Sequence, residues 1–134
     1  MKKYIIMSFM ILAVFGNSCS QEQSQNSKTK LAPTEFAAKM KTIPNAPLID
    51  VRTSGEFSEG HLQNAKNIDW NSDNFDKQIA ELDKSKPVFV YCLSGNRSRA
   101  AADRMRTVGF KEVYEMQGGI TKWESAGLPV TIGK

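Results

Sequence analysis

Cysteine and histidine are scarce in this sequence, which has two cysteines and one histidine among 134 residues. So few thiols exclude a scaffold stapled by several disulfides, and a lone histidine offers no metal-ligand spacing. An excess of charge of one sign is also missing, because 18 basic side chains face 14 acidic ones and two of the basic ones, Lys2 and Lys3, precede an apolar N-terminal stretch. This balance does not indicate nucleic-acid binding. We therefore expect no metal, no nucleic acid, and a fold held together by its hydrophobic core.

The N-terminal stretch lacks the length of a membrane span, since Tyr4–Phe15 is shorter than the about 20 residues that a crossing helix needs. Two lysines, an apolar run and the small residues NSCS form instead the pattern of a secretory signal, which we place at residues 1–18. A buried core helix fits less well, because the stretch is apolar on all sides. We expect an exported protein of the periplasm or cell envelope.

Cys19 follows this signal in the stretch GNSCS, which resembles the cleavage and lipidation site of bacterial lipoproteins. That resemblance implies that Cys19 carries a lipid anchor. Gly16 and Asn17 stand where that family usually has a leucine and a small alanine or serine, so ordinary cleavage near Cys19 is the alternative. If Cys19 is acylated, Cys92 has no disulfide partner in the chain.

The remaining chain fits one domain, with 40% apolar and 24% charged residues overall. Residues 19–30 are expected to form a disordered tether, because Ser20–Lys30 has no apolar side chain that could anchor it to a core. The folded domain is expected at 31–134. Its pattern alternates short apolar runs with helical periodicity, which predicts an α/β domain with a mainly parallel sheet and helices on both faces.

The expected strands are Leu48–Val51, a weak strand around Asn67 and Ile68, Val88–Tyr91 and Val113–Met116. The expected helices are one capped by Thr34 and ended before Pro44, a short turn capped by Ser54 and ending at Gly60, Phe75 to Leu82, and one from near Ser98 to Gly109. Gly118 and Gly119 are expected to form a turn, after which a last helix carries Ile120 and Trp123 and ends at Gly127.

Cys92 comes directly after the strongest predicted strand, VFVY, and ligands of open α/β sheets bind beyond the carboxyl ends of their strands. In the loop that follows, Gly95 allows successive backbone N–H groups to turn toward one point, where they and the next helix N-terminus favour negative charge. We expect an exposed thiolate there, with Arg97 placed to bind an incoming oxyanion. Ser98 could cap the helix or hydrogen-bond the sulfur. The alternative is that Cys92 is an inert core residue and that Arg97 lies on solvated helix surface. Arg99 lies off the loop, and we expect it on solvated helix surface.

The stretch CLSGNRS, Cys92–Ser98, resembles the active-site loop of single-domain rhodaneses, which are sulfurtransferases. Three further stretches resemble family segments in the same order, and together they cover essentially Leu31 to Val130: LIDVRTSGEF at Leu48–Phe57, GHLQNAKNI at Gly60–Ile68 and MQGGITKWESAGLPV at Met116–Val130.

This resemblance implies that Cys92 takes a sulfane sulfur from thiosulfate, a persulfide or a polysulfide and holds it as a Cys92 persulfide. A thiol, cyanide or protein acceptor then takes the sulfur from Cys92. It also implies that the anionic sulfur is held by the loop residues Leu93, Ser94, Gly95, Asn96, Arg97 and Ser98. No cofactor is implied, and we expect a monomer whose membrane contact is its lipid anchor. Asp50, Arg52, Glu56 and His61 are expected to hold the fold near the site.

Two departures from the family pattern stand out. Asn64 replaces a glycine that is frequent before Ala65, and the loop lacks the basic residue that many thiosulfate-using members carry between the cysteine and the arginine. Thiosulfate is therefore expected to be a poor donor. Cysteine phosphatases and arsenate reductases have a similar loop, but with five residues between the cysteine and the arginine. This chain has only four, Leu93–Asn96, so its smaller loop favours sulfur over phosphate. The alternative from another class is a tethered module that carries sulfur or binds an anion without turnover.

Overall fold

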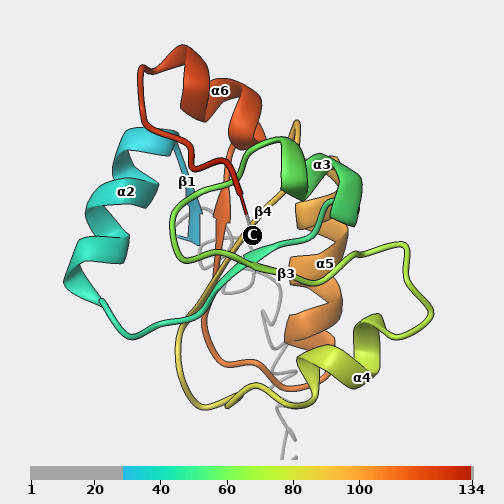
Figure 1. Cartoon of the computed structure of the whole chain (residues 1–134). Helices are drawn as coiled ribbons and strands as arrows, with labels where there is room; N and C mark the ends of the chain where they lie inside the picture. The colour runs from blue at the N-terminus through green and yellow to red at the C-terminus, as the bar shows by residue number, and fades with distance from the viewer. Residues whose placement is uncertain (1–28, 134) are drawn as a thin grey trace, which may run out of the picture.

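A single parallel sheet organises the computed structural model, which describes residues 29–133 (Figure 1). The five strands lie in the order β1, β5, β4, β2, β3, and their bounds are Lys30–Leu31 (β1), Leu48–Asp50 (β2), Lys66–Asn67 (β3), Val88–Tyr91 (β4) and Val113–Met116 (β5). Every pairing is parallel, so the predicted α/β fold is confirmed. The predicted signal, Cys19 and nearly all of the predicted tether lie outside the described residues.

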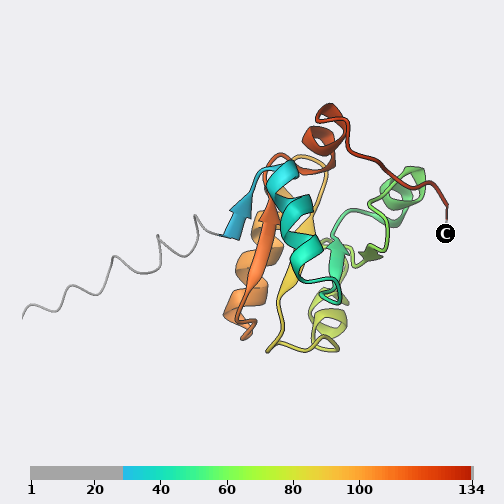
Figure 2. The same ribbon diagram turned by 90° about the vertical axis from the view of Figure 1, so that its left-hand side faces the viewer.

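The described helices are α2 (Pro33–Thr42), α3 (Ser54–Glu59), α4 (Phe75–Ile79), α5 (Asn96–Thr107) and α6 (Gly119–Ser125). Figures 1 and 2 show α3 and α6 at the same end of the molecule, with α4 at the opposite end. None of these helices, within residues 29–133, combines the length and the apolar character that a bilayer crossing requires.

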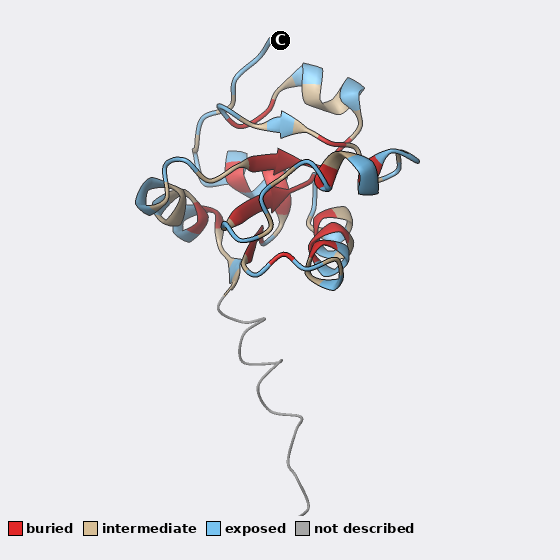
Figure 3. Cartoon of the chain, turned by 90° about the horizontal axis from the view of Figure 1, so that it is seen from below, coloured by how far each residue is buried: buried red, intermediate tan, exposed pale blue. Residues whose placement is uncertain are grey.

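Strand β4 shows how the sheet positions its neighbours. Its alternate side chains enter two separate core clusters: Val88, Val90 and Cys92 pack with residues of α4 and α5, and Phe89 and Tyr91 pack with residues of α2 and α6. All four residues of the strand are buried, as expected for a central strand covered on both faces. Figure 3 shows this buried sheet between helices whose outer faces are exposed. The predicted helices on both faces are therefore present.

Several element boundaries differ from the prediction, each for a local reason. Helix α2 begins at Pro33, whose missing N–H costs nothing at a first helical position, and Glu35 accepts a hydrogen bond from the backbone N–H of Ala32. Thr34 is therefore inside the helix and is not its cap. Helix α3 is capped by Thr53 instead of Ser54, because the Thr53 hydroxyl accepts the hydrogen bond from Glu56 N.

Two further differences concern the ends of elements. Helix α4 stops at Ile79, so Leu82 packs against the core from the turn that follows. Strand β1 was not predicted, since two residues are too few to show a periodicity. Lys30, the last residue of the predicted tether, pairs there with Glu115, so regular structure begins one residue before the expected boundary.

The carboxyl ends of β2 and β4 lie side by side, because the two strands are paired from Leu48–Phe89 to Asp50–Tyr91. The chain leaves β2 toward β3 on one side and leaves β4 toward β5 on the other. A crevice at such a point of reversal is the usual ligand site of an open α/β sheet. Here α3, which follows β2, and the Cys92 loop, which follows β4, come after the carboxyl ends of these two neighbouring strands.

Candidate active site

Cys92 lies at the end of β4, directly below the loop that leads into α5. Its Sγ accepts a hydrogen bond from Gly95 N at 3.1 Å, and the residue is 1% exposed. The expectation of an exposed sulfur is wrong, because the alternation of β4 directs this side chain to the face that α5 covers, like Val88 and Val90. Among residues 29–133, Gly95 is the one donor to Sγ. The sulfur thus sits at the floor of the loop.

Gly95 makes this geometry possible. It has φ of +105° and precedes the first residue of α5, so the chain turns sharply enough to bring its N–H back to the sulfur three residues earlier. A Cβ at this position would lie 3.3 Å from Gly118 N, on the turn that follows β5. The predicted need for glycine here therefore has two sources, the backbone angle and the close approach of a second turn.

The loop is held from the other side by the start of α6. Ile120 N donates to the Cys92 carbonyl at 2.9 Å and Thr121 N donates to the Leu93 carbonyl at 3.1 Å. These bonds require Gly119, because a Cβ there would lie 2.3 Å from Leu93 O. The sequence predicts only a turn at Gly119. The two consecutive glycines after β5 are the sequence feature that could have indicated this close backbone contact.

Arg97 points to α3 and not to an open space. Its two terminal nitrogens donate to the two carboxylate oxygens of Glu56, each at 2.7 Å, and both side chains are about one quarter exposed. The same carboxylate accepts hydrogen bonds from the backbone N–H and the hydroxyl of Thr53. The bonds from Arg97 lower the pKa of Glu56 to about 2, and the Glu56 carboxylate raises the pKa of Arg97. The positive charge predicted beside the site is present, but it is compensated.

Ser98 settles one alternative that the sequence left open. Its hydroxyl is buried and donates to the Gly95 carbonyl at 3.2 Å, so it bonds neither the sulfur nor a free helix N–H. It fastens the first turn of α5 to the loop. Leu93, Ser94 and Asn96 are exposed, and Leu93 is an apolar side chain that is 43% accessible at the loop tip.

Asp50 and Arg52 form a buried ion pair at 2.7 Å beneath the site. Arg52 also donates to the Gly60 carbonyl at 2.7 Å, which links the end of β2 to the end of α3. Burial works against the charge of Arg52, but its hydrogen bonds to Asp50 outweigh this, so the pKa of Arg52 is raised. His61 stacks on Phe57 and its Nδ1 lies 2.9 Å from the Phe57 carbonyl oxygen. These contacts support α3. None of the four side chains predicted to hold the fold near the site, which are Asp50, Arg52, Glu56 and His61, forms a hydrogen bond with Cys92.

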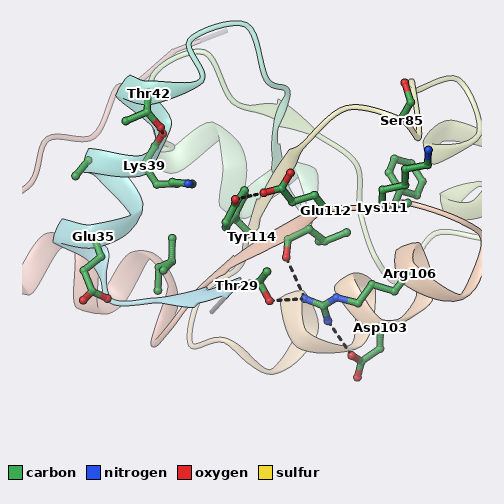
Figure 4. A pocket seen from close by; sticks show the side chains of 14 residues that line it. Thr29, Glu35, Lys39, Thr42, Ser85, Asp103, Arg106, Lys111, Glu112 and Tyr114 are labelled. Atoms are coloured by element: carbon green, nitrogen blue, oxygen red, sulfur yellow. Dashed lines mark hydrogen bonds and ion pairs between the residues drawn. The ribbon is translucent and has the colours of Figure 1, made fainter. Parts of the chain in front are cut away.

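Two hollows lie outside the immediate surroundings of Cys92. One, of about 270 Å³, borders the loop at Ser94, Gly95 and Asn96. The larger one, of about 1340 Å³, lies between α2 and the ends of β5 and α5, and contains none of the predicted site residues (Figure 4). Within the described chain, no three side chains of the metal-ligating types come together as a group that could hold a metal ion.

Arg106 and Tyr114 organise the larger hollow in Figure 4. Arg106 donates to the Val113 carbonyl, and its ion pair with Glu115 reaches a carboxylate that is only 2% exposed. Burial, followed by a hydrogen bond to Glu112, raises the pKa of Tyr114 to about 12. Arg106 and Tyr114 are thus engaged by neighbouring polar groups, and no cysteine or histidine is among the described residues that line this hollow.

Comparison with known proteins gives a consistent result. A family model described as "Rhodanese-like domain" matches residues 32–126. The uncharacterized protein YqhL of Bacillus subtilis is 33% identical over 119 residues, which cover 89% of this chain and 88% of YqhL. The thiosulfate sulfurtransferase GlpE of Shewanella oneidensis is 31% identical over 87 residues, covering 65% of this chain and 84% of GlpE. The polysulfide-sulfur transferase homodimer of Wolinella succinogenes has a similar structure, with a TM-score of 0.67, 29% identity, and coverage of 84% of this chain and 85% of that one.

Proposed function

Since the chain belongs to the rhodanese-like family, we propose that it is a sulfurtransferase in which Cys92 carries the transferred sulfur as a persulfide. The observation that carries this proposal is the hydrogen bond from Gly95 N to Sγ, at the floor of a loop that follows the central strand. A backbone N–H aimed at sulfur stabilises negative charge on it. The names of two relatives, a thiosulfate sulfurtransferase and a polysulfide-sulfur transferase, support the same class of reaction.

The proposed reaction consists of two displacements. The Cys92 thiolate attacks the outer sulfur of the donor; the bond between the two donor sulfurs breaks, and its electron pair leaves with sulfite when the donor is thiosulfate, or with a thiolate when it is an organic persulfide. A Cys92 persulfide anion remains. An acceptor thiolate or cyanide then attacks the outer sulfur of this persulfide, and Cys92 leaves as a thiolate. With a thiolate acceptor, a new sulfur–sulfur bond replaces the one that breaks; with cyanide, the carbon–sulfur bond of thiocyanate replaces it. No external oxidant or reductant is needed in either case, because each step only transfers a sulfane sulfur between two nucleophiles.

The loop supplies the electrostatic part of this chemistry. Once the outer sulfur is added, the N–H groups of the loop from Leu93 to Arg97 would stabilise its negative charge. The loop would need little rearrangement for this, because α6 and Glu56 hold it in place. Arg97 has guanidinium donors left after its two bonds to Glu56, and these can orient an incoming donor. Its charge is partly cancelled by Glu56, which disfavours thiosulfate and favours persulfide or polysulfide donors.

Mass spectrometry of the reduced, folded protein tests this proposal. Incubation with thiosulfate, polysulfide or an organic persulfide should add the mass of one sulfur, and a thiol or cyanide should remove it. Cys92→Ser should abolish the adduct and leave the melting temperature close to that of the wild type, because serine is similar in size. If no donor adds sulfur to folded wild-type protein, the burial of Cys92 favours the second candidate, a module that binds anions without turnover.

We also propose that Cys19 is lipidated and anchors the protein in the cell envelope, on the strength of the GNSCS stretch after an apolar signal. Growth with labelled palmitate should label the wild type but not Cys19→Ala. Equal partitioning of both proteins into the aqueous phase of a detergent extraction would instead indicate ordinary cleavage and a soluble exported protein.

We further propose that the domain acts as a monomer, although one relative is a homodimer by its own description. Light scattering on the delipidated protein should give the mass of one chain. A mass of two chains across a dilution series would contradict this.

A further inference from the structure

A basic groove lies on the side of the active-site loop opposite Glu56. Three cationic side chains line it from three different elements, Lys30 on β1, Arg99 on α5 and Lys122 on α6. None of them forms an ion pair with another residue of the range 29–133, and all three are exposed. The one acidic residue in the lining, Glu115, is buried and paired with Arg106. The Glu115 carboxylate also attracts Lys30 electrostatically, but three cationic side chains face this one buried acidic residue. The groove therefore carries an excess of positive charge.

Local contacts hold the charged side chains of the groove close to the Cys92 loop. The side chain of Lys122 lies over Gly118, where a Cβ would come within 2.2 Å of it, so the glycine leaves room for the lysine stem along the groove wall. Lys30 reaches the groove because β1 pairs with the end of β5. Sequence reasoning had placed Arg99 on solvated helix surface. Its companions come from segments about 70 and 20 residues away in sequence, so only the tertiary structure reveals the cluster.

The groove and the sulfur of Cys92 flank the same residue. Gly95 lines the groove, and its N–H donates to Sγ. The three loop residues that border the groove, Ser94 to Asn96, span at most about 10 Å of chain. A ligand that extends across the loop could therefore reach the sulfur while its other end remains in the groove, whose volume of about 270 Å³ has room for one end of a small molecule.

The distribution of charge selects the kind of ligand. Leu93, Ser94 and Asn96 carry no charge, and Arg97 is engaged by Glu56. Thiosulfate carries its charges next to the sulfur that is transferred, so it would need a free cation at the mouth of the loop. The free cations lie instead across the loop. A donor suited to this arrangement has anionic groups separated from its outer sulfur by a spacer of several bonds.

We infer that this groove binds the carboxylate groups of a small organic persulfide whose outer sulfur is transferred to Cys92. The inference rests on the proposed sulfurtransferase function. In the step it serves, the Cys92 thiolate attacks the outer sulfur, the sulfur–sulfur bond of the donor breaks, and the donor leaves as its thiolate with its carboxylates still held by Lys30, Arg99 and Lys122.

The test compares two donors with one skeleton, glutathione persulfide and the persulfide of glutathione diethyl ester, in which both carboxylates are masked. The kcat/KM ratio of free acid to ester is measured for the full-length protein and for a groove variant, Lys30→Gln/Arg99→Gln/Lys122→Gln. Wild type should prefer the free acid by about tenfold, as three partly exposed ion pairs allow, and the groove variant should lose this preference. A control with the same change in net charge alters exposed lysines elsewhere, Lys41→Gln/Lys66→Gln/Lys77→Gln, and should keep it.

If the ratio of kcat/KM for free acid to that for ester is the same in wild type and groove variant, the inference that the groove binds the donor is overturned. The proposal that Cys92 forms a persulfide is not affected by that result. If no donor loads Cys92 in any of the proteins, the proposed function fails, and the groove is judged separately by calorimetric titration with S-methylglutathione, which cannot transfer sulfur. Binding that weakens about tenfold in the groove variant but not in the control supports the groove. Equal binding, or none to wild type, overturns it.

Discussion

Replacing Gly119 by alanine should disturb both stability and the candidate active site. Gly119 has φ of +61°, and a Cβ there would lie 2.3 Å from the carbonyl oxygen of Leu93 and 2.5 Å from that of Cys92. Both atoms belong to the backbone of the candidate active-site loop. They cannot rotate away as the end of a flexible side chain would, so the loop and α6 must separate.

Gly127 provides the matched control. It also has a positive φ, +75°, but a Cβ there would meet no heavy atom within 4 Å. Gly127→Ala should therefore cost only the conformational penalty, about 1–2 kcal/mol. Gly119→Ala carries the same penalty together with overpacking of about 1–3 kcal/mol, and weakens the bonds from Ile120 N and Thr121 N to the loop, at about 1 kcal/mol each. We expect Gly119→Ala to cost about 2–4 kcal/mol more than Gly127→Ala.

Urea unfolding followed by tryptophan fluorescence measures this difference, and each kcal/mol should lower Tm by about 4–8 °C for a domain of this size. At a temperature where both variants are folded, sulfur loading of Cys92 should slow in Gly119→Ala only, because the carbonyls on either side of Cys92 are displaced. Equal losses of stability in the two variants, or a large loss with unaltered loading in Gly119→Ala, would refute the idea that α6 holds the loop in its working shape.

Three other substitutions probe the polar contacts around the site and the sheet. Glu56→Gln removes a carboxylate whose pKa of about 2 lies below the ordinary 4.5 because Arg97 donates to it; the wild type should be more stable by about 1–2 kcal/mol above pH 4.5, and urea titrations should show this advantage disappearing toward pH 2. Tyr91→Phe leaves a buried backbone N–H without the hydroxyl that accepts its hydrogen bond, so thermal unfolding should show a loss of about 1–3 kcal/mol. Arg106→Met strands the buried carboxylate of Glu115, whose pKa burial already raises; unfolding should reveal a loss of about 3–5 kcal/mol at pH 8 that shrinks at pH 5, where the carboxyl takes up a proton in the folded state.

Local sequence signals were enough for the main elements of the fold. VFVY is a wholly apolar run and VYEM is apolar except for Glu115, and both form buried strands at the predicted positions. Gly109 ends α5 with a φ of +104°, as a glycine after a helical pattern indicates. Asn64, in place of a family glycine, adopts a φ of +66°, so the turn keeps the left-handed backbone that the glycine would supply. In each case the signal and the structure involve neighbouring residues.

The misjudged features depend on residues far apart in sequence. Whether Cys92 is exposed depends on whether a helix covers the end of β4 as well as its middle, and the sequence does not state this; α5 covers it here. The sequence around Arg97 predicts a free cation. In the structure, α3 places Glu56, which is 41 residues away in sequence, in contact with it. Cap positions failed for a smaller reason: adjacent threonine and serine residues offer equivalent oxygens, and only the backbone angles choose between them.

By itself, the sequence determined that one α/β domain with a parallel sheet would place a cysteine after its central strand, because hydrophobic periodicity and turn residues act over a few neighbouring positions. Only the tertiary structure decided the surroundings of that cysteine. The burial of its sulfur, the pairing of Arg97 and the gathering of Lys30, Arg99 and Lys122 beside the loop arise from strand order and helix packing. Electrostatic interactions depend on distance in space, and distance in space is set by the fold.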